Sequence, residues 1–537
     1  MTTKNTFFSL IIIVFLSFTL QAQTPFLVNI QAVNLSQTPA IQSFAHAEWE
    51  GKWLLLGGRI DGLHRRQPFA SFAAEGNNTQ IYVVDVAAGQ VWQRPVTELP
   101  TGLQEQLQSS NMEHFQHLDT LYLIGGYAYS ASAGDHITFP YLTAVHVPAL
   151  IQAIIQGQPI AGHFQQLQDD RMAVTGGELG RIGDVFYLVG GQLFNGRYNP
   201  MGPDHGPGFE QVYTNAVSRF RISSSQGQLA VSDYETWFDE ANLHRRDYNL
   251  APQIFPGGQM GYTAFSGVFQ HNQDLPFLNT VDITPAGYTV NNDFVQYLSH
   301  YHSAKAPLYE TANQTMHTLF FGGISQFYFN ENGQMTEDPD VPFVRTISCV
   351  SRDANGQMLE TRMPVDMPGL LGAGAAFIQA DNTPVLTNGI INLDAIPADQ
   401  PMLVGYVVGG ISSTQPNVFW LNGDDLSNAS GSILGVYLTK TTATGVKPIQ
   451  GGNPLTLELI PNPAQQEVKV KFGAPIKGTA FFYVQDSTGR IIRTFDAEVE
   501  EHGVYTTAMV LDDLPKGLYY MHITVGHYTR SQKLLIE

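Results

Sequence analysis

A short apolar run that ends in two glycines recurs along this chain of 537 residues and constrains its fold more than any other feature. A weaker copy at residues 263–267 fills the interval between the third and fourth clear copies. A strand that ends in glycines and returns at long spacing is typical of a repeat architecture, so we predict an all-β fold of six similar units. The five clear copies end at Gly57-Gly58, Gly125-Gly126, Gly190-Gly191, Gly322-Gly323 and Gly409-Gly410.

Each unit is expected to place one short strand before the glycine-ended strand and one or two strands after it. One short helix is expected at residues 147–155. The wide interval between Gly323 and Gly409 leaves room for a seventh unit at residues 370–392. The expected strands of the first unit are residues 43–49, 52–56, 80–85 and 91–98.

The segment at residues 26–35 alternates apolar and polar side chains, as a strand does, but precedes the first unit. A circular array of sheets leaves bare strand edges unless one end of the chain completes the last sheet. We therefore expect residues 26–35 to pair with the last unit.

The units resemble kelch-type β-propellers of the galactose-oxidase-like class, in which an apolar strand and two glycines precede a tyrosine and a tryptophan. The resemblance implies a six-bladed propeller over residues 24–440, with seven blades as an alternative. The aromatic residues would fill the wedges between neighbouring sheets. The matching residues are Gly57, Gly58, Tyr82 and Trp92 in the first unit, Gly190, Gly191, Tyr213 and Trp237 in the third, and Gly409, Gly410 and Trp420 in the sixth.

The first 23 residues have the pattern of a secretory signal peptide. Lys4 supplies a positive charge, residues 7–20 are apolar, and Ala22 is a small residue suited to cleavage. The apolar stretch is shorter than the roughly 20 residues of a spanning helix. We therefore expect an exported mature protein with no transmembrane helix.

The last part of the chain reads as a separate domain. Residues 441–453 form a linker rich in Thr, Gly and Pro, and several short alternating strands in residues 454–537 predict a small β-sandwich. This segment resembles the type A C-terminal sorting domain of type IX (Por) secretion cargo. The matching residues are Pro461, Asn462, Pro463, Asp486, Gly489, Leu514, Pro515, Lys516, Gly517, Leu518, Tyr519 and the final residues 533–536.

The resemblance implies a partner and a destination. The type IX machinery of a Gram-negative bacterium would carry the protein across the outer membrane. The sorting domain would then be cleaved, leaving the protein on the cell surface or in the extracellular space.

Composition disfavours two classes of function. The net charge of −20 disfavours binding to nucleic acid, which requires Lys and Arg against phosphates, and to anionic membrane surfaces. The single cysteine, Cys349, excludes an intramolecular disulfide, and its apolar surroundings indicate a buried strand residue.

Two basic groups are candidate ligand-binding sites, because arginine can hold a carboxylate or phosphate with two hydrogen bonds. The alternative for both groups is ion pairing between neighbouring units. If the second group lies on the innermost strand of the fourth unit, alternation would point Arg245 and Asp247 to one side and Arg246 to the other. The first group is Arg59, Asp61, His64, Arg65 and Arg66 in the loop at residues 59–79, and the second is Arg245, Arg246 and Asp247.

No metal site, cofactor or catalytic residue is assigned. His300 and His302 would share a face if they lay on a strand, and Asp204, His205 and Glu210 could add ligands, but nothing brings the two groups together. The acidic loops at residues 337–340 and 422–425 lack the spacing of a dedicated calcium loop. No nucleophile elbow occurs.

These features favour a secreted or cell-surface propeller that binds a glycan or protein ligand through its long inter-strand loops. The alternative is an extracellular carbohydrate-active enzyme, an acidic-sugar mutarotase or an oxidase-like protein, that uses the propeller channel. The strand setting of Cys349 disfavours the oxidase version.

Overall fold

The computed structural model describes residues 24–67, 69–199, 208–421, 423, 425–441, 449, 452–511 and 513–537. The protein is all-β, with many antiparallel sheets and few short helices. The signal-peptide prediction and most of the predicted linker lie outside the described residues.

The described residues up to Lys440 form six successive sheets, each with four antiparallel strands at its centre. The first contains β2 (Ala45–Trp49), β3 (Lys52–Leu56), β4 (Gln80–Asp85) and β5 (Gln90–Pro95). The second contains β6 (Ser110–His117), β7 (Thr120–Ser130), β9 (Tyr141–His146) and β10 (Phe164–Gln168), with β8 (Asp135–Thr138) beside β7. The third contains β11 (Glu178–Ile182), β12 (Val185–Val189), β15 (Ala216–Ser225) and β16 (Gln228–Phe238).

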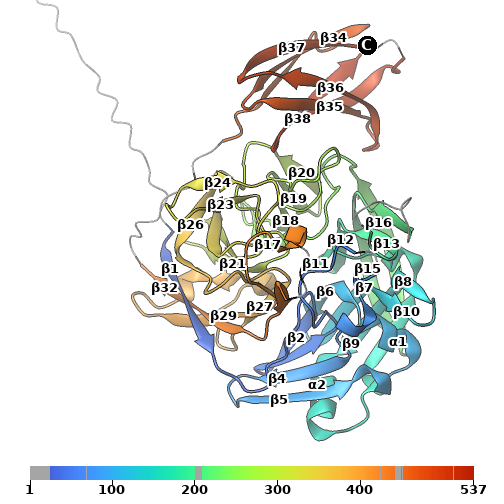
Figure 1. Ribbon diagram of the computed structural model, residues 1–537, viewed down its shortest axis with the longest axis vertical. Coiled ribbons are helices and arrows are strands. Elements are labelled where there is room, and N and C mark those ends of the chain that lie inside the picture. The colour runs from blue at the N-terminus through green and yellow to red at the C-terminus, as the bar shows by residue number, and fades with distance from the viewer. Residues whose placement is uncertain are drawn as a thin grey trace, which may run out of the picture.

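The fourth sheet contains β17 (Asn249–Ile254), β18 (Met260–Phe265), β19 (Thr280–Thr284) and β20 (Gly287–Asn291). The fifth contains β21 (Ala304–Glu310), β22 (Thr315–Phe321), β25 (Thr346–Arg352) and β26 (Met358–Asp366), with β28 (Ile391–Asn392) parallel to β21. The sixth contains β27 (Ala375–Gln379), β29 (Met402–Gly409), β32 (Ile433–Lys440) and β1 (Phe26–Val33). Figure 1 shows the sheets around a common centre, with the first strand of each innermost.

Three short hairpins extend from the loops after the glycine-ended strands in the described part of the chain: β13 (Gln192–Gly196) with β14 (Phe209–Tyr213), β23 (Phe327–Phe329) with β24 (Met335–Glu337), and β30 (Ile411–Ser413) with β31 (Ser427–Ala429). The α-helices are α1 (Thr101–Gln106), α2 (Val147–Gln156) and α3 (Val418–Leu421). Helix α2 confirms the helix expected at residues 147–155. Its His146 N-cap and its left-handed Gly157 C-cap define its ends.

The glycine pairs join each sheet to the next. At five junctions the N–H of the second glycine donates to a backbone carbonyl of the following sheet. A Cβ added to the first glycine would collide with that same carbonyl oxygen, and the second glycine has a positive φ that side chains disfavour, so both positions favour glycine. The last junction joins the sixth sheet to the first. The donors and acceptors are Gly58 to Ser109 (2.8 Å), Gly126 to Val174 (3.0 Å), Gly191 to Arg245 (2.8 Å), Gly323 to Leu371 (2.9 Å) and Gly410 to Ile41 (2.9 Å).

The fourth sheet, which lacks a double glycine, makes its junction differently. The side-chain amide of Asn249 donates to the carbonyl of His300 in the fifth sheet at 2.7 Å. Its side-chain oxygen accepts from the N–H of Ser303 at 3.1 Å. A polar side chain therefore supplies the contact that a glycine backbone supplies elsewhere.

The N-terminal strand completes the last sheet, as the sequence predicts. Strand β1 pairs antiparallel with β32 over eight residues, from Phe26 opposite Lys440 to Val33 opposite Ile433. The N–H of Thr441 donates to the carbonyl of Pro25, so the two ends of this part of the chain meet. The possible seventh unit at residues 370–392 is instead shared by two sheets: β27 belongs to the sixth and β28 to the fifth.

The last domain is a β-sandwich. One sheet contains β33 (Thr456–Ile460), β34 (Glu467–Ala474) and β37 (Gly503–Val510), and the other contains β36 (Ile491–Val499), β35 (Gly478–Gln485), β38 (Gly517–Val525) and β39 (Tyr528–Ile536). The two sheets share an apolar core.

The residues of the sorting motif have local structural roles. Asn462, between Pro461 and Pro463, joins the edge of β39 by bonds to the carbonyl of Lys533 and the N–H of Leu535. The hydroxyl of Tyr519 donates to the carbonyl of Pro515 at 2.8 Å. Leu514 packs against the sandwich core, Gly517 begins β38, and Gly489 ends the turn after β35 with φ +88°.

One buried carboxyl makes stability depend on pH. Burial raises the pKa of Glu360 to about 8, although the carboxyl accepts bonds from Leu298 and Ser348. The folded state therefore holds a proton that the unfolded chain releases above pH ~4.5, so stability falls as pH rises from about 5 to 8, by up to about 1.4 kcal/mol per unit.

Replacing Glu360 by Gln is expected to remove this dependence. Thermal unfolding at pH 5, 6, 7 and 8 should show the variant gaining stability over the wild type as pH rises. Parallel curves for the two proteins would contradict the assignment.

Candidate functional site

The first strands of the sheets enclose a central cavity of about 390 Å³. All six sheets contribute to its wall, through the first strands and the residues just before them. A volume of this size lies within the range of small-molecule sites. The cavity is therefore the candidate functional site.

A ring of backbone hydrogen bonds surrounds one end of the cavity. At the start of each first strand, or just before it, one residue has a left-handed backbone, and five of these residues donate their N–H to the carbonyl of the corresponding residue in the preceding sheet. These hydrogen bonds arrange six equivalent residues in a ring around the central cavity. They are Ser43, Asn111, Gly176, Asp247, His302 and Gly374.

Asp247, one of these six residues, is contacted by Arg246 and by two other residues of the ring. Its carboxylate accepts from Arg246 Nη1 at 2.5 Å and from Asn111 Nδ2 at 3.4 Å. His302 Nδ1 lies 3.9 Å from the same carboxylate. Burial lowers the pKa of His302, which favours its neutral form.

Two further polar pairs line the cavity. Lys305 Nζ on β21 contacts Glu178 Oε1 on β11 at 2.5 Å. His114 Nε2 on β6 lies 3.1 Å from His46 Nδ1 on β2. Burial lowers the pKa of both histidines, so they pair as neutral rings, one donating and one accepting.

Glu113 on β6 is a buried carboxyl in the wall of the cavity. Its side chain is 1 % exposed, and its Oε1 accepts from the N–H of Gly177 at 2.8 Å. Its Oε2 is buried without a hydrogen-bond partner among the described residues. Burial raises the pKa of this carboxyl well above its usual range, which favours the protonated form, and a protonated carboxyl can donate a hydrogen bond.

Aromatic rings complete the wall of the cavity: Phe44, Phe115, Tyr248 and Phe377. A site with apolar rings and a few placed polar groups suits a ligand with both apolar faces and hydroxyl groups.

The first predicted group of site residues stabilises a loop. Arg59 is 2 % exposed and bonds to Asp61 at 2.8 Å, Asn77 at 2.8 Å and the carbonyl of Ala73 at 2.9 Å. A guanidinium with this many partners fixes the conformation of the loop after β3.

The rest of that group packs among aromatic residues. The ring of His64 stacks on Phe72 at 4.8 Å, and burial lowers its pKa to about 4. The Arg66 guanidinium lies 4.5 Å from the centre of the exposed Trp420 ring, and Arg65 is half-buried. None of the five residues of this group is in the described wall of the cavity.

The second predicted group is divided. Arg245 is buried and bonds to the carbonyls of Asn242 and Ser266 at 2.7 and 2.6 Å. Arg246 donates to the Tyr213 hydroxyl at 2.9 Å as well as to Asp247. Of the eight predicted residues, Asp247 alone lies in the described wall of the cavity.

The alternation expected for this segment is wrong. Strand β17 begins at Asn249, and Asp247 has a left-handed backbone with φ +49°. A left-handed residue breaks the two-residue period of a strand, so Arg245 and Asp247 do not share a face.

His300 and His302 lie before strand β21, which begins at Ala304. Both have left-handed φ values, so they do not share the face of a strand. His300 is buried and lies 2.5 Å from the carbonyl of Gly322, whereas His302 lines the cavity. No group of three or more His, Cys, Asp or Glu side chains suited to a metal ion occurs in the part of the chain that the structure describes. Asp204 and His205 lie outside that part.

Sequence reasoning missed most of the cavity wall: Glu113, Glu178, Lys305, His46 and His114. Their common signal is position, since each lies on the short strand before a glycine-ended strand. Charged or ionisable residues on an innermost strand are the feature that would have identified them.

Comparison with known proteins identifies the last domain. Residues 458–537 match the family described as the secretion system C-terminal sorting domain. No curated protein matches the chain. The matched domain indicates export through the type IX system to the cell surface or the extracellular space. No helix in the described ranges is long and apolar enough to cross a membrane.

Two solved structures show only distant likeness. The structure of YjhT is 10% identical, with 78% of this chain and 99% of that chain covered and a TM-score of 0.42. PorZ of Porphyromonas gingivalis, an essential bacterial surface component of the type-IX secretion system, is 9% identical, with 95% and 100% covered and a TM-score of 0.12. At these TM-scores neither likeness establishes the fold of residues 24–440.

Proposed function

Because residues 458–537 are a secretion system C-terminal sorting domain, we propose that the protein is type IX cargo whose residues 1–23 are a signal peptide and whose residues 24–440 are a six-bladed kelch-like propeller. The junctions between successive sheets support this fold, because the last of them returns from Gly410 to Ile41. Pairing of β1 with β32 supports it as well.

The function we propose for the propeller is carbohydrate binding in its central cavity. The observation that carries this proposal is the buried carboxyl of Glu113, a residue in the wall of a cavity of about 390 Å³, because one of its oxygens has no hydrogen-bond partner in the part of the chain that the structure describes. A buried polar atom without a partner costs free energy that a ligand hydroxyl would recover. The aromatic rings of the wall suit the apolar faces of a sugar.

The charges of the site favour a neutral sugar over an acidic one. Lys305, the lysine of the described wall, is already paired with Glu178. Arg246 is bonded to Asp247, and Arg245 is enclosed by backbone carbonyls. A ligand carboxylate would have to displace one of these partners. We therefore expect the sugar to bind in the central cavity and not on the long loops.

An enzyme that transfers protons on a carbohydrate is the second candidate. Glu113 supports it, since burial favours the protonated form of its carboxyl and a protonated carboxyl can serve as a general acid. Glu178, which is paired with Lys305 in the same cavity, places a second acidic side chain in a different environment from that of Glu113.

One pair of variants separates the two candidates. Residues 24–537 are screened on an array of neutral and acidic glycans, and hits are measured by calorimetry and assayed for turnover. Glu113→Ala is expected to weaken binding about 10–100-fold, from the loss of one buried hydrogen bond. Glu113→Gln retains a donor at the same place and is expected to bind within a few-fold of the wild type.

Turnover that Glu113→Gln abolishes, with binding intact, would establish the enzyme instead, because an amide cannot transfer the proton. Glu467→Gln, at an exposed position of β34 in the sandwich, is the matched control. Binding unchanged by Glu113→Ala, in a variant with native unfolding temperature, would refute the cavity as the site.

A further inference from the structure

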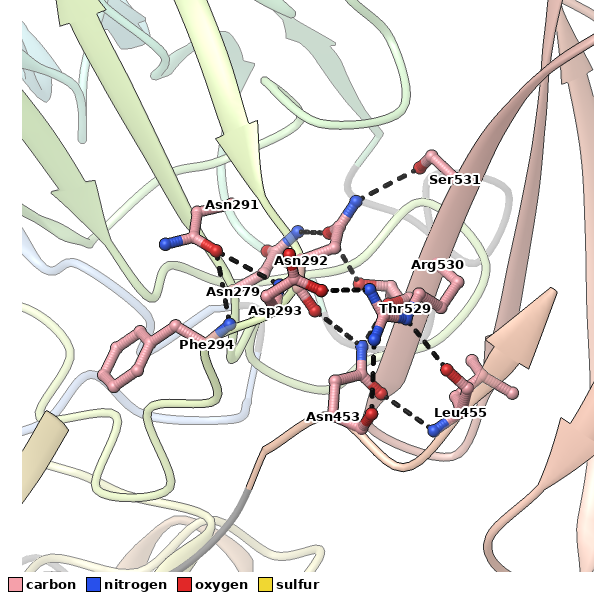
Figure 2. Close-up of polar contacts among 10 residues, drawn as sticks. All are labelled: Asn279, Asn291, Asn292, Asp293, Phe294, Asn453, Leu455, Thr529, Arg530 and Ser531. Atoms are coloured by element: carbon pink, nitrogen blue, oxygen red, sulfur yellow. Dashed lines mark hydrogen bonds and ion pairs between the residues drawn. The ribbon is translucent and has the colours of Figure 1, made fainter. Parts of the chain in front are cut away.

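The sorting domain is attached to the fourth sheet by a network of polar contacts (Figure 2). Arg530 on β39 forms an ion pair with Asp293, just after β20. The same guanidinium donates to the carbonyls of Leu455 at 2.8 Å and Asn453 at 3.3 Å. One side chain therefore joins the sandwich, the end of the linker and the fourth sheet.

Asn453 and Asn292 lie at the centre of this network. Asn453 Nδ2 donates to the carbonyls of Asn292 at 2.8 Å and Thr529 at 2.6 Å. Asn292 Nδ2 donates to the Ser531 hydroxyl at 3.3 Å, and its Oδ1 accepts from Asn279 at 2.6 Å. Figure 2 shows these side chains meeting between β20 and the sandwich.

A second polar contact joins the sandwich to the end of the third sheet. Gln485 Nε2 donates to Asp239 at 2.6 Å, and both side chains are buried. Glu240 donates its backbone N–H to the Gly489 carbonyl at 3.0 Å and accepts from the N–H of Ile491 at 3.0 Å. The approach is close, since a Cβ on Gly489 would collide with a backbone carbonyl of β16.

A third contact is apolar. Leu278, Tyr297 and Phe327 belong to the same buried cluster as the core of the sandwich. The Tyr297 and Tyr528 hydroxyls lie 3.3 Å apart, and the His527 ring packs edge-on against Phe327 at 4.8 Å. The apolar core therefore continues from one domain into the other.

We propose that the sorting domain remains bound to the propeller, as a noncovalent complex, when the chain is cut in the linker at residues 442–448. The three contacts come from the third, fourth and fifth sheets and their loops, so the sandwich is held at separate points. Described residues on the C-terminal side of the cut are fixed as well: the N–H of Ile449 donates to the Glu360 carbonyl, and Gly452 pairs with Phe294. The covalent link is therefore not what positions the domain.

The test is cleavage of the intact protein. A site for a specific protease is inserted between Thr444 and Gly445 in residues 24–537, and the cut protein is passed through gel filtration at low micromolar concentration. We expect both fragments to elute together at the size of the uncut protein. Separate elution of two folded fragments, as judged by circular dichroism, would overturn the proposal.

An exchange of charges tests whether the interface seen in the structure is the one that holds the two fragments of the cut protein together. Asp293→Lys is expected to raise the dissociation constant of the cut protein about tenfold or more, because it places two cations together. Adding Arg530→Glu should recover most of that loss. Arg493→Glu, in an exposed ion pair with Asp513 on the sandwich, is the matched control and should leave the constant within about twofold.

Equal affinity of the wild type and Asp293→Lys, or failure of the exchange to recover affinity, would refute this interface. Neither outcome depends on carbohydrate binding, since the network lies outside the wall of the cavity.

Discussion

Replacing Gly125 by alanine is expected to lower the free energy of unfolding by about 3 kcal/mol or more, the range of severe single substitutions. Gly125 has φ +64°, and a Cβ there would collide with the carbonyl oxygen of Val174 in the next sheet. That carbonyl accepts the N–H of Gly126 at 3.0 Å, so moving it away also breaks the junction between the sheets. Urea unfolding of residues 24–537 measures the change.

Gly89 provides the matched control for this substitution. It has nearly the same backbone, with φ +68°, but no atom lies within 4 Å of an added Cβ. Gly89→Ala should therefore cost only the left-handed strain, about 1–2 kcal/mol. Equal costs at the two positions would show that backbone conformation alone, and not the junction, requires glycine at position 125.

Deleting residues 24–36 is expected to leave the protein insoluble or unfolded. Strand β1 pairs with β32 over its whole length, and Phe26 and Val28 are buried in a cluster that the fifth and sixth sheets share. Their burial is worth about 1.5–3 kcal/mol each, and the deletion also exposes an unpaired strand edge. Soluble yield and gel filtration of residues 37–537 measure the effect.

The control for the deletion is a change on the exposed side of the same strand. Leu27 is 43% exposed, so Leu27→Thr keeps the backbone pairing and both buried neighbours. Its stability should stay within about 1 kcal/mol of the wild type. A folded, monomeric deletion protein would show that β32 tolerates an open edge.

The sequence was most informative where a local rule determines the structure. Glycine pairs end their strands because a backbone carbonyl of the next sheet occupies the space of a Cβ. The alternating segment at residues 26–35 became β1 because a bare edge of the last sheet requires a partner. Helix α2 and the strands of the sandwich followed from equally local patterns.

The candidate site was harder to predict because its residues meet only after six sheets are assembled. Glu113, Glu178 and Lys305 lie on three different first strands, and no short motif connects them. The arginines were predicted to bind a ligand because of their charge, but the charge of a residue does not indicate which group it contacts. Arg59 proved to bond to Asp61, two residues away, and Arg245 to backbone carbonyls that sequence patterns do not locate.

The pairing of β1 with β32 also delays completion of the sixth sheet until the propeller segment has been made. The strand that leaves the ribosome first has its partner at the far end of the propeller segment, next to the linker. Such long-range pairing must await the whole segment, and contacts between distant parts of a chain form slowly. The first-made strand therefore stays unpaired until residues 433–440 have been made, and the sorting domain follows them in the chain. The sixth sheet is completed only shortly before the sorting domain is made, so a chain that stops before residue 433 lacks both the partner of β1 and the sorting domain.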